Sequence, residues 1–162
     1  ATFNDLYLVN KYTDNPLLKQ TENGYSTYMH RPKVFRIAEI YLIAAEAAYK
    51  NNDQTNAKTY LDRLRAARGI GSVTYTDLWA EIQNERNREL AFEGFRMADI
   101  KRWNLGVVRG TPQNLNAIVS DPADQYHQLN IPAGNYKMVW PLPPSDILYE
   151  QGKANWQQNP GC

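Results

Sequence analysis

The amino-acid sequence predicts a mainly helical, all-α fold with long irregular loops. Two segments repeat apolar residues at helical spacing, the first from Val34 to Lys50 and the second from about Thr55 to Arg68. A third segment places a glutamate at every fourth position from Glu81 to Glu89, the spacing of one helix face. Local sequence signals then indicate where each element begins and ends.

The first predicted helix, residues 34–50, follows an irregular lead-in. We expect residues 1–31 to be irregular or short-stranded, because Asn, Thr, Tyr and Gly are mixed there without a sustained period. Pro32 suits a position just before or inside a first helical turn. A helix with two apolar faces is expected to pack between two neighbours. The two faces here hold Val34, Ile37, Ala38, Tyr41, Ala45 and Ala48 on one side and Ile40, Ile43, Ala44 and Ala47 on the other.

The second predicted helix completes a helix pair over residues 34–68. The polar run 51–53 separates the two helices, and Gly69 supplies a stop after the second one. A single face is apolar in this helix, so we expect it to pack on the first through that face. The residues of the face are Ala57, Tyr60, Leu61 and Leu64.

Residues 76–103 are expected to form two further helices. Thr76 and Asp77 can cap a helix that runs to about Phe92, with an acidic residue in its first turn. Gly94 interrupts the pattern. A following helix over residues 95–103 would direct Met97, Ile100 and Trp103 toward the core.

The remaining segment, residues 104–162, is predicted to be rich in loops. Its composition shifts to Asn, Pro, Gly and Ser, and Pro141, Pro143 and Pro144 exclude a continuous helix there. Only a one-turn helix over about 145–149 is expected, because Ser145 and Asp146 can cap it.

Charge and apolar bulk alternate in the third predicted helix and beyond it. Like charges four residues apart cost a few tenths of a kcal/mol per pair on an exposed helix. The glutamates at 81, 85 and 89 therefore predict nearby arginines and a buried position. The arginines expected to supply the partners are Arg86, Arg88, Arg96 and Arg102. The predicted structural charge network consists of Glu85, Arg86, Glu89, Glu93, Arg96, Asp99 and Arg102.

The sequence holds no pattern typical of an enzyme or of a metal site. Glu85 and Glu89 could be imagined as a pair of glycosidase carboxylates, but arginines three or four residues away would lower their pKa values, the reverse of what a general acid needs. His30 and His127 are the only histidines and do not have the spacing of metal ligands. We therefore expect no catalytic residue, no metal and no cofactor.

Composition excludes further classes of partner. A formal net charge of +1 indicates neither a nucleic-acid interface nor an anionic membrane surface. The sequence has one cysteine, Cys162, so an internal disulfide is impossible. No apolar run approaches the roughly 18 to 20 residues of a membrane span.

Aromatic residues are the best candidates for ligand binding. The chain contains eleven Tyr and four Trp, and an aromatic ring can stack on the C–H face of a sugar while amide groups nearby bind its hydroxyls. Loop aromatics also commonly just pack, and that alternative stays open. The candidate ligand-binding residues are Tyr25, Tyr28, Trp140 and Trp156.

Four motifs, taken in order, resemble the C-terminal part of the SusD/RagB family. The resemblance extends from about Tyr28 to the last residue. The motifs are the blocks 36–47 (RIAEIYLIAAEA), 85–96 (ERNRELAFEGFR), 99–103 (DIKRW) and 158–161 (QNPG). The stretch 140–147 (WPLPPSDI) also resembles the family's aromatic-Pro-x-Pro stretch before its ending.

The resemblance implies a role in nutrient uptake. Family members are lipid-anchored, non-enzymatic proteins of the Gram-negative outer membrane that bind glycans or other nutrients over a TonB-dependent transporter. It implies an oligosaccharide or polysaccharide ligand, a transporter partner, a location at the cell surface, and a lipid-carrying cysteine upstream of this chain. By the same resemblance, this chain would be mainly the helical scaffold and the transporter-docking part.

The helix pair 34–68 also resembles one tetratricopeptide unit. Tyr41 falls at its bulky aromatic position, Ala45 and Ala57 at its small contact positions, and Leu61 at its large gap-filling position. The alternative function is therefore a generic tetratricopeptide adaptor that binds a peptide between stacked helix pairs. Such an adaptor needs about three similar units in tandem, and the sequence shows one.

Overall fold

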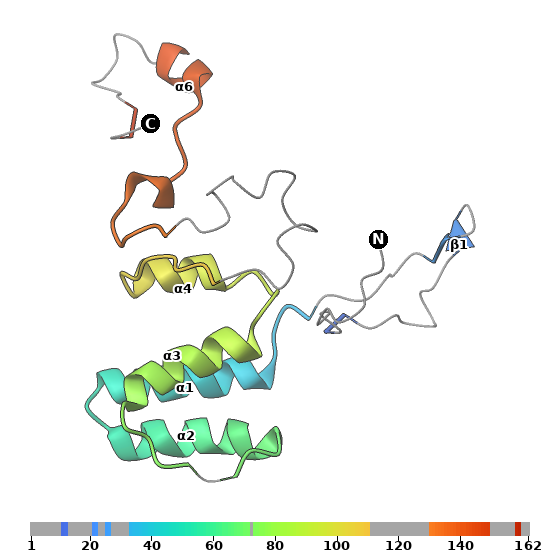
Figure 1. Ribbon diagram of the computed structural model, residues 1–162, viewed down its shortest axis with the longest axis vertical. Coiled ribbons are helices and arrows are strands. Elements are labelled where there is room, and N and C mark those ends of the chain that lie inside the picture. Colours follow the sequence, from blue (N-terminus) through green and yellow to red (C-terminus); the bar gives the residue numbers. More distant parts are fainter. Residues whose placement is uncertain are drawn as a thin grey trace. The chain divides into compact units, whose positions relative to one another are not determined.

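The computed structural model describes residues 11–12, 21–22, 25–26, 33–71, 73–110, 130–149 and 158–159. The fold is mainly helical, as predicted (Figure 1). The chain divides into two compact units, Ala1–Gly94 and Phe95–Cys162. None of the helices in the described ranges combines the length and the apolar character needed to cross a membrane.

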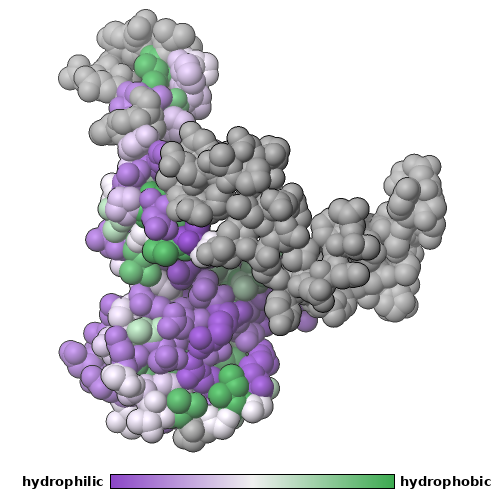
Figure 2. Space-filling model, viewed as in Figure 1, coloured by the Kyte–Doolittle hydropathy of each residue, from purple (hydrophilic) through white to green (hydrophobic). Residues whose placement is uncertain are grey.

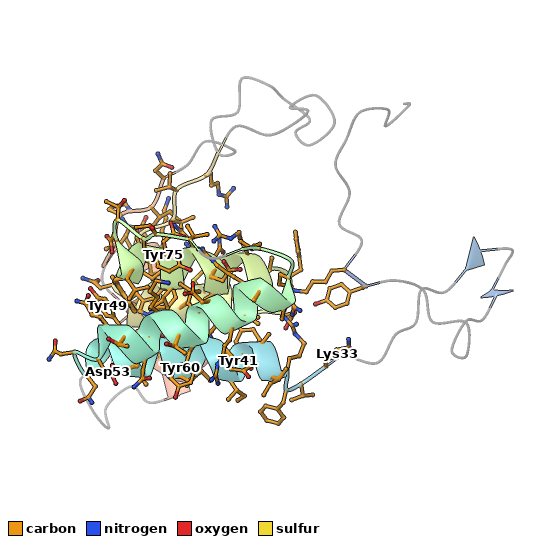
Figure 3. All side chains as sticks on the ribbon, turned by 90° about the horizontal axis from the view of Figure 1, so that it is seen from below. Lys33, Tyr41, Tyr49, Asp53, Tyr60 and Tyr75 are labelled. Carbon is orange, nitrogen blue, oxygen red and sulfur yellow. The ribbon has the colours of Figure 1, made fainter. Side chains whose placement is uncertain are left out.

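The first unit is built on helices α1 (Ile37–Lys50), α2 (Gln54–Ala67) and α3 (Leu78–Glu89). A hairpin of two two-residue strands, β1 (Thr21–Glu22) and β2 (Tyr25–Ser26), precedes them. The helices α1 and α2 lie side by side, and α3 packs mainly against α1 (Figures 1 and 3).

Local signals explain the ends of α1 and α2. The helix α1 begins at Ile37 rather than at Val34, because Arg36 is extended, with φ −134° and ψ 141°. At the turn between the helices Asn52 has a positive φ of 60°, a conformation that Asn tolerates better than most residues. The carboxylate of Asp53 then caps α2 by accepting a hydrogen bond of 3.0 Å from the backbone N–H of Asn56.

The core of this unit lies between the three helices. Leu42, Leu61 and Ile82, one from each helix, are completely buried. Removing each of these side chains from water contributes roughly 1.5 to 3 kcal/mol. Ala45 and Ala57 are also completely buried, as their predicted small contact positions in a tetratricopeptide-like pair require.

The prediction that α1 is buried on both apolar faces is wrong for its second face. Ile40 is 51% exposed and Ile43 is 48% exposed, whereas Ala38 and Ala45 on the first face are buried. Both α2 and α3 pack on α1. On the face drawn in Figure 2, hydrophilic residues dominate the described surface and hydrophobic residues form small separate patches.

The helix α3 ends earlier than the predicted Phe92. Its last residue is Glu89, and a turn follows in which Phe92 has φ 65° and Gly94 has φ 86°. These left-handed residues cannot continue an α-helix. At the other end, the Asp77 carboxylate caps α3 as predicted, by accepting a 3.0 Å hydrogen bond from the N–H of Ala80.

The second unit contains α4 (Arg96–Arg102), the 3₁₀-helix η2 (Tyr136–Met138) and α6 (Pro144–Tyr149). An antiparallel bridge joins Val107 to Ile131. Gly106 lies so close to this bridge that a Cβ atom would come within 2.5 Å of the Ile131 carbonyl oxygen, so the residue must be glycine. The described parts of residues 104–162 are mostly loop.

Candidate functional site

The most buried ion pair of the chain's described part joins α2 to α3. Arg65 Nε donates a 2.7 Å hydrogen bond to Glu85 Oε2, and both side chains are at most 6% exposed. Arg65 Nη2 also donates to Glu81 Oε2 at 2.6 Å. On the solvent side, Arg88 Nη2 reaches the same Glu85 oxygen at 2.8 Å. The glutamate ladder of α3 is thus held in place by cations rather than solvated.

A second group of charges lies at the C-terminal end of α3. Glu89 accepts two parallel hydrogen bonds from Arg68, at 2.9 and 2.7 Å, and a third from Arg36 Nη1 at 2.7 Å. The Arg36 side chain continues to Glu93, with Nε 3.1 Å from Oε2 and Nη2 2.8 Å from Oε1. Arg36 and Arg68 therefore connect the start of α1 and the end of α2 to one end of α3.

These contacts lower the pKa values of the carboxyls. The hydrogen bonds from Arg68 lower the pKa of Glu89 most strongly, and those from Arg36 add to them against the opposing effect of burial. Burial raises the pKa of Glu93, but hydrogen bonds from Lys11 and Arg36 outweigh it, so that this pKa also lies below its ordinary value. Both groups remain ionised at neutral pH. A general acid for sugar hydrolysis requires the opposite shift.

The arginine partners predicted from the sequence are only partly the observed ones. Arg88 pairs with Glu85, while the Arg86 side chain points to α1, where Nη2 lies 3.6 Å from Glu39 Oε1. Arg102 pairs within α4, donating to Asp99 at 2.9 Å. Arg96 is exposed at the start of α4.

The sequence-based interpretation missed Arg36, Arg65 and Arg68 as the principal partners of α3. A signal was present for Arg65, which lies four residues after Leu61 and next to Leu64, on the face already predicted to be buried. A buried arginine predicts a buried carboxylate near it. Which helix would supply that carboxylate could not be read from the spacing, because Arg65 and Glu85 meet only through the packing of α2 on α3.

Of the four aromatic candidates for ligand binding, Trp140 is the one whose side chain the structure describes. This residue is 88% exposed to solvent. Tyr25 contributes its backbone to β2. Tyr28, Trp156 and the Tyr25 side chain lie outside the described residues, so the structure does not bring the four together.

The backbone around Trp140 is held by the segment 158–159. Asn159 Nδ2 donates to the Trp140 carbonyl oxygen at 2.6 Å. Gln158 binds both backbone groups of Leu142, accepting from its N–H at 2.8 Å and donating to its carbonyl at 2.9 Å. The Gln158 side-chain amide therefore satisfies both backbone groups of Leu142, and the Asn159 amide satisfies the Trp140 carbonyl. An exposed indole on a fixed backbone can stack on a ligand without ordering the main chain first.

The described residues offer little else for chemistry. In the ranges that the structure describes, no three His, Cys, Asp or Glu side chains are grouped so that they could hold a metal ion. His30 and His127 lie outside those ranges. The described geometry thus consists of an ion-paired helical unit and an exposed tryptophan on a pinned loop.

Comparison with known proteins places this arrangement in a family. A curated relative, "SusD-like protein P25" of Formosa agariphila, is 35% identical over 80 residues, which cover 44% of this chain and 15% of that protein. A solved structure, "BT4246", is similar in fold, with a TM-score of 0.63 and 23% identity over 94% of this chain and 28% of that chain. The matched part of this chain thus spans less than a third of either protein. The SusD family (SusD_RagB) itself matches residues 1–161, and the chain therefore belongs to the SusD family.

Proposed function

We propose that this chain is part of a non-enzymatic glycan-binding component of an outer-membrane nutrient-uptake system. The family match over residues 1–161 carries the proposal. In this proposal the whole protein is lipid-anchored at the cell surface, presents an oligosaccharide or polysaccharide, and passes it to a TonB-dependent transporter.

The role we assign to this chain is that of the helical scaffold and of the part that docks on the transporter. Its best-paired carboxylates, Glu85 and Glu89, bind arginines of other elements, which suits structural support. The apolar face of α1 with Ile40 and Ile43, about half exposed, supports a role in docking on another protein surface.

Within this chain, Trp140 is the residue we propose for sugar contact. Its exposure leaves the ring face free to stack on pyranose C–H groups, and Gln158 and Asn159 hold the loop beneath it. Tyr25, Tyr28 and Trp156 remain candidates for the same kind of contact. One stacked ring contributes on the order of 1 kcal/mol beyond the area it buries, so a single Trp cannot give tight binding.

Titration of this chain with plant, host and storage glycans tests the proposal. We expect a dissociation constant weaker than about 1 μM, equivalent to about 8 kcal/mol, because the proposed contacts in this chain are few. Affinity electrophoresis in glycan-containing gels should detect the residual binding. Trp140→Ala should clearly weaken it, and Val139→Ala, which changes the adjacent residue of 50% exposure, should leave it unchanged.

Two outcomes would contradict parts of the proposal. Micromolar or tighter binding by this chain would show that it carries the principal glycan site and is not mainly scaffold. Separately, the full-length protein should co-purify with a TonB-dependent transporter. Failure of that co-purification, with both proteins folded and present, would overturn the proposed partnership.

A further inference from the structure

The turn after α3 gathers several oxygen atoms around one point. The last carbonyl groups of any α-helix lack partners within the helix, and they carry the partial negative charge of the helix dipole. Here the residues that follow, 90–94, form a turn in which Phe92 adopts a left-handed φ of 65°. This conformation is rare for an aromatic residue. The carbonyls of Glu89 and Ala91 and the Glu93 carboxylate, which Arg36 also contacts, together form an acceptor-rich site.

The ammonium group of Lys11 occupies that site. Lys11 Nζ donates to the carbonyl oxygens of Glu89 at 2.7 Å and of Ala91 at 2.8 Å, and it lies 2.5 Å from Glu93 Oε1. An ammonium group has three N–H donors, so these three acceptors match its full donor capacity. This is a far more complete set of partners than a surface lysine usually finds.

The next residue adds a second anchor. Tyr12 OH donates a 2.6 Å hydrogen bond to the carbonyl oxygen of Phe92, the residue with the unusual backbone conformation. Lys11 and Tyr12 thus bind successive parts of the same turn, about 80 residues away in the sequence. The contact is a tertiary one that no local preference of either segment requires.

Several features distinguish this contact from an ordinary surface ion pair. Two of the three Lys11 acceptors are backbone carbonyls, whose positions the helix end sets and whose charge no side-chain substitution removes. The Glu93 carboxylate is only 11% exposed and is oriented by Arg36. The Lys11 side chain itself is 27% exposed, so it is partly withdrawn from solvent.

We propose that residues 89–93 form a binding site for a primary ammonium group, that Lys11 is its occupant, and that Lys11 and Tyr12 together latch their segment onto the end of α3. The recognition chemistry is specific: N–H donors point at two carbonyl oxygens, and the Glu93 carboxylate, which Arg36 also contacts, is the third acceptor. A quaternary ammonium carries the charge but has no donors. The site should therefore distinguish the two kinds of cation.

Amide hydrogen exchange of the 162-residue chain tests the latch. The Glu93 N–H, which donates to the Leu90 carbonyl at 3.1 Å, reports on the turn, and the Leu90 N–H, which donates to the Arg86 carbonyl at 3.0 Å, reports on the helix end. In Lys11→Ala and in Lys11→Met, which retains the aliphatic chain, we expect exchange at both amides to accelerate about tenfold or more, because a charge-assisted anchor is lost. Lys33→Ala removes the same charge from an exposed lysine and serves as the matched control.

Chemical rescue then tests the ligand class. In Lys11→Ala, n-butylammonium chloride should restore slow exchange, whereas tetramethylammonium chloride at the same ionic strength should not. Tyr12→Phe should accelerate exchange at Glu93, and in the double variant Lys11→Ala/Tyr12→Phe the n-butylammonium salt should still slow it. The proposal is overturned if the amides of Lys11→Ala exchange at the same rates as those of Lys33→Ala, because Lys11 would then not hold the turn. It is also overturned if both ammonium salts slow exchange equally, because charge alone would then explain the contact.

Discussion

Replacement of Glu85 by alanine should destabilise the protein by more than the loss of a few side-chain atoms would suggest. The Glu85 and Arg65 side chains are 5% and 6% exposed, so the variant leaves a guanidinium buried without its main partner. Breaking a buried pair in this way costs about 3 to 5 kcal/mol. Arg65 keeps Glu81 at 2.6 Å, which favours the lower end, about 3 kcal/mol.

The assay is thermal and urea unfolding followed by far-ultraviolet circular dichroism. For a chain of this length a loss of 1 kcal/mol lowers Tm by about 2 to 4 °C, so Glu85→Ala should lower it by roughly 6 to 12 °C. Arg88→Ala is the matched control. It removes the other partner of the same carboxylate, but that arginine is 55% exposed, and we expect it to cost no more than about 1 kcal/mol.

A double replacement separates the cost of an unpaired buried charge from the cost of the lost side-chain volume. Arg65→Met combined with Glu85→Leu removes both charges and fills the space with apolar atoms, and such replacements are often neutral or stabilising. The double variant should therefore be clearly more stable than Glu85→Ala. The reasoning fails if Glu85→Ala costs no more than Arg88→Ala, or if the double variant is the least stable of the three.

Three other outcomes follow from the same contacts. Glu89→Ala should cost about 1 to 3 kcal/mol, less than Glu85→Ala because Arg68 is 45% exposed, and a Tm within a degree of wild type would contradict the network. Ala57→Leu should cost about 1 to 3 kcal/mol by overpacking a completely buried position, and unchanged urea unfolding would argue against a tight helix contact there. The third concerns pH: the Glu89 and Glu93 carboxyls have lowered pKa values in the folded state, so their stabilisation is complete above the unfolded value of about 4.3 and is lost as pH falls through the folded values. Tm should drop over that acidic range, and Glu89→Gln should flatten the drop; an equal drop in the variant would refute the assignment.

Much of the secondary structure is determined by local sequence. The predicted helix 55–68 is observed at Gln54–Ala67, and the one-turn helix expected near 145–149 at Pro144–Tyr149. Apolar spacing, the Asp53 and Asp77 caps and the prolines act within a few residues, so they can be read without knowing the fold.

The partners of the charged residues were decided by tertiary structure. The spacing of glutamates on α3 predicts that cations must lie near, but Arg65 and Arg68 come from α2 and Arg36 from before α1. The same holds for Trp140, whose exposure the sequence could not indicate and whose supports lie at 158–159.

The start of α1 and the end of α3 show why local sequence does not predict every helix boundary. Periodicity predicted that the first helix begins at Val34 and that the third ends at about Phe92. In the structure α1 begins only at Ile37, and α3 already ends at Glu89. At these two ends Arg36 reaches Glu89 and Glu93, and Tyr12 binds the Phe92 carbonyl. Local sequence determines which conformations of each segment are low in free energy. Contacts between segments far apart in the chain select among them, because one charge-assisted hydrogen bond contributes as much free energy as several residues of helix preference.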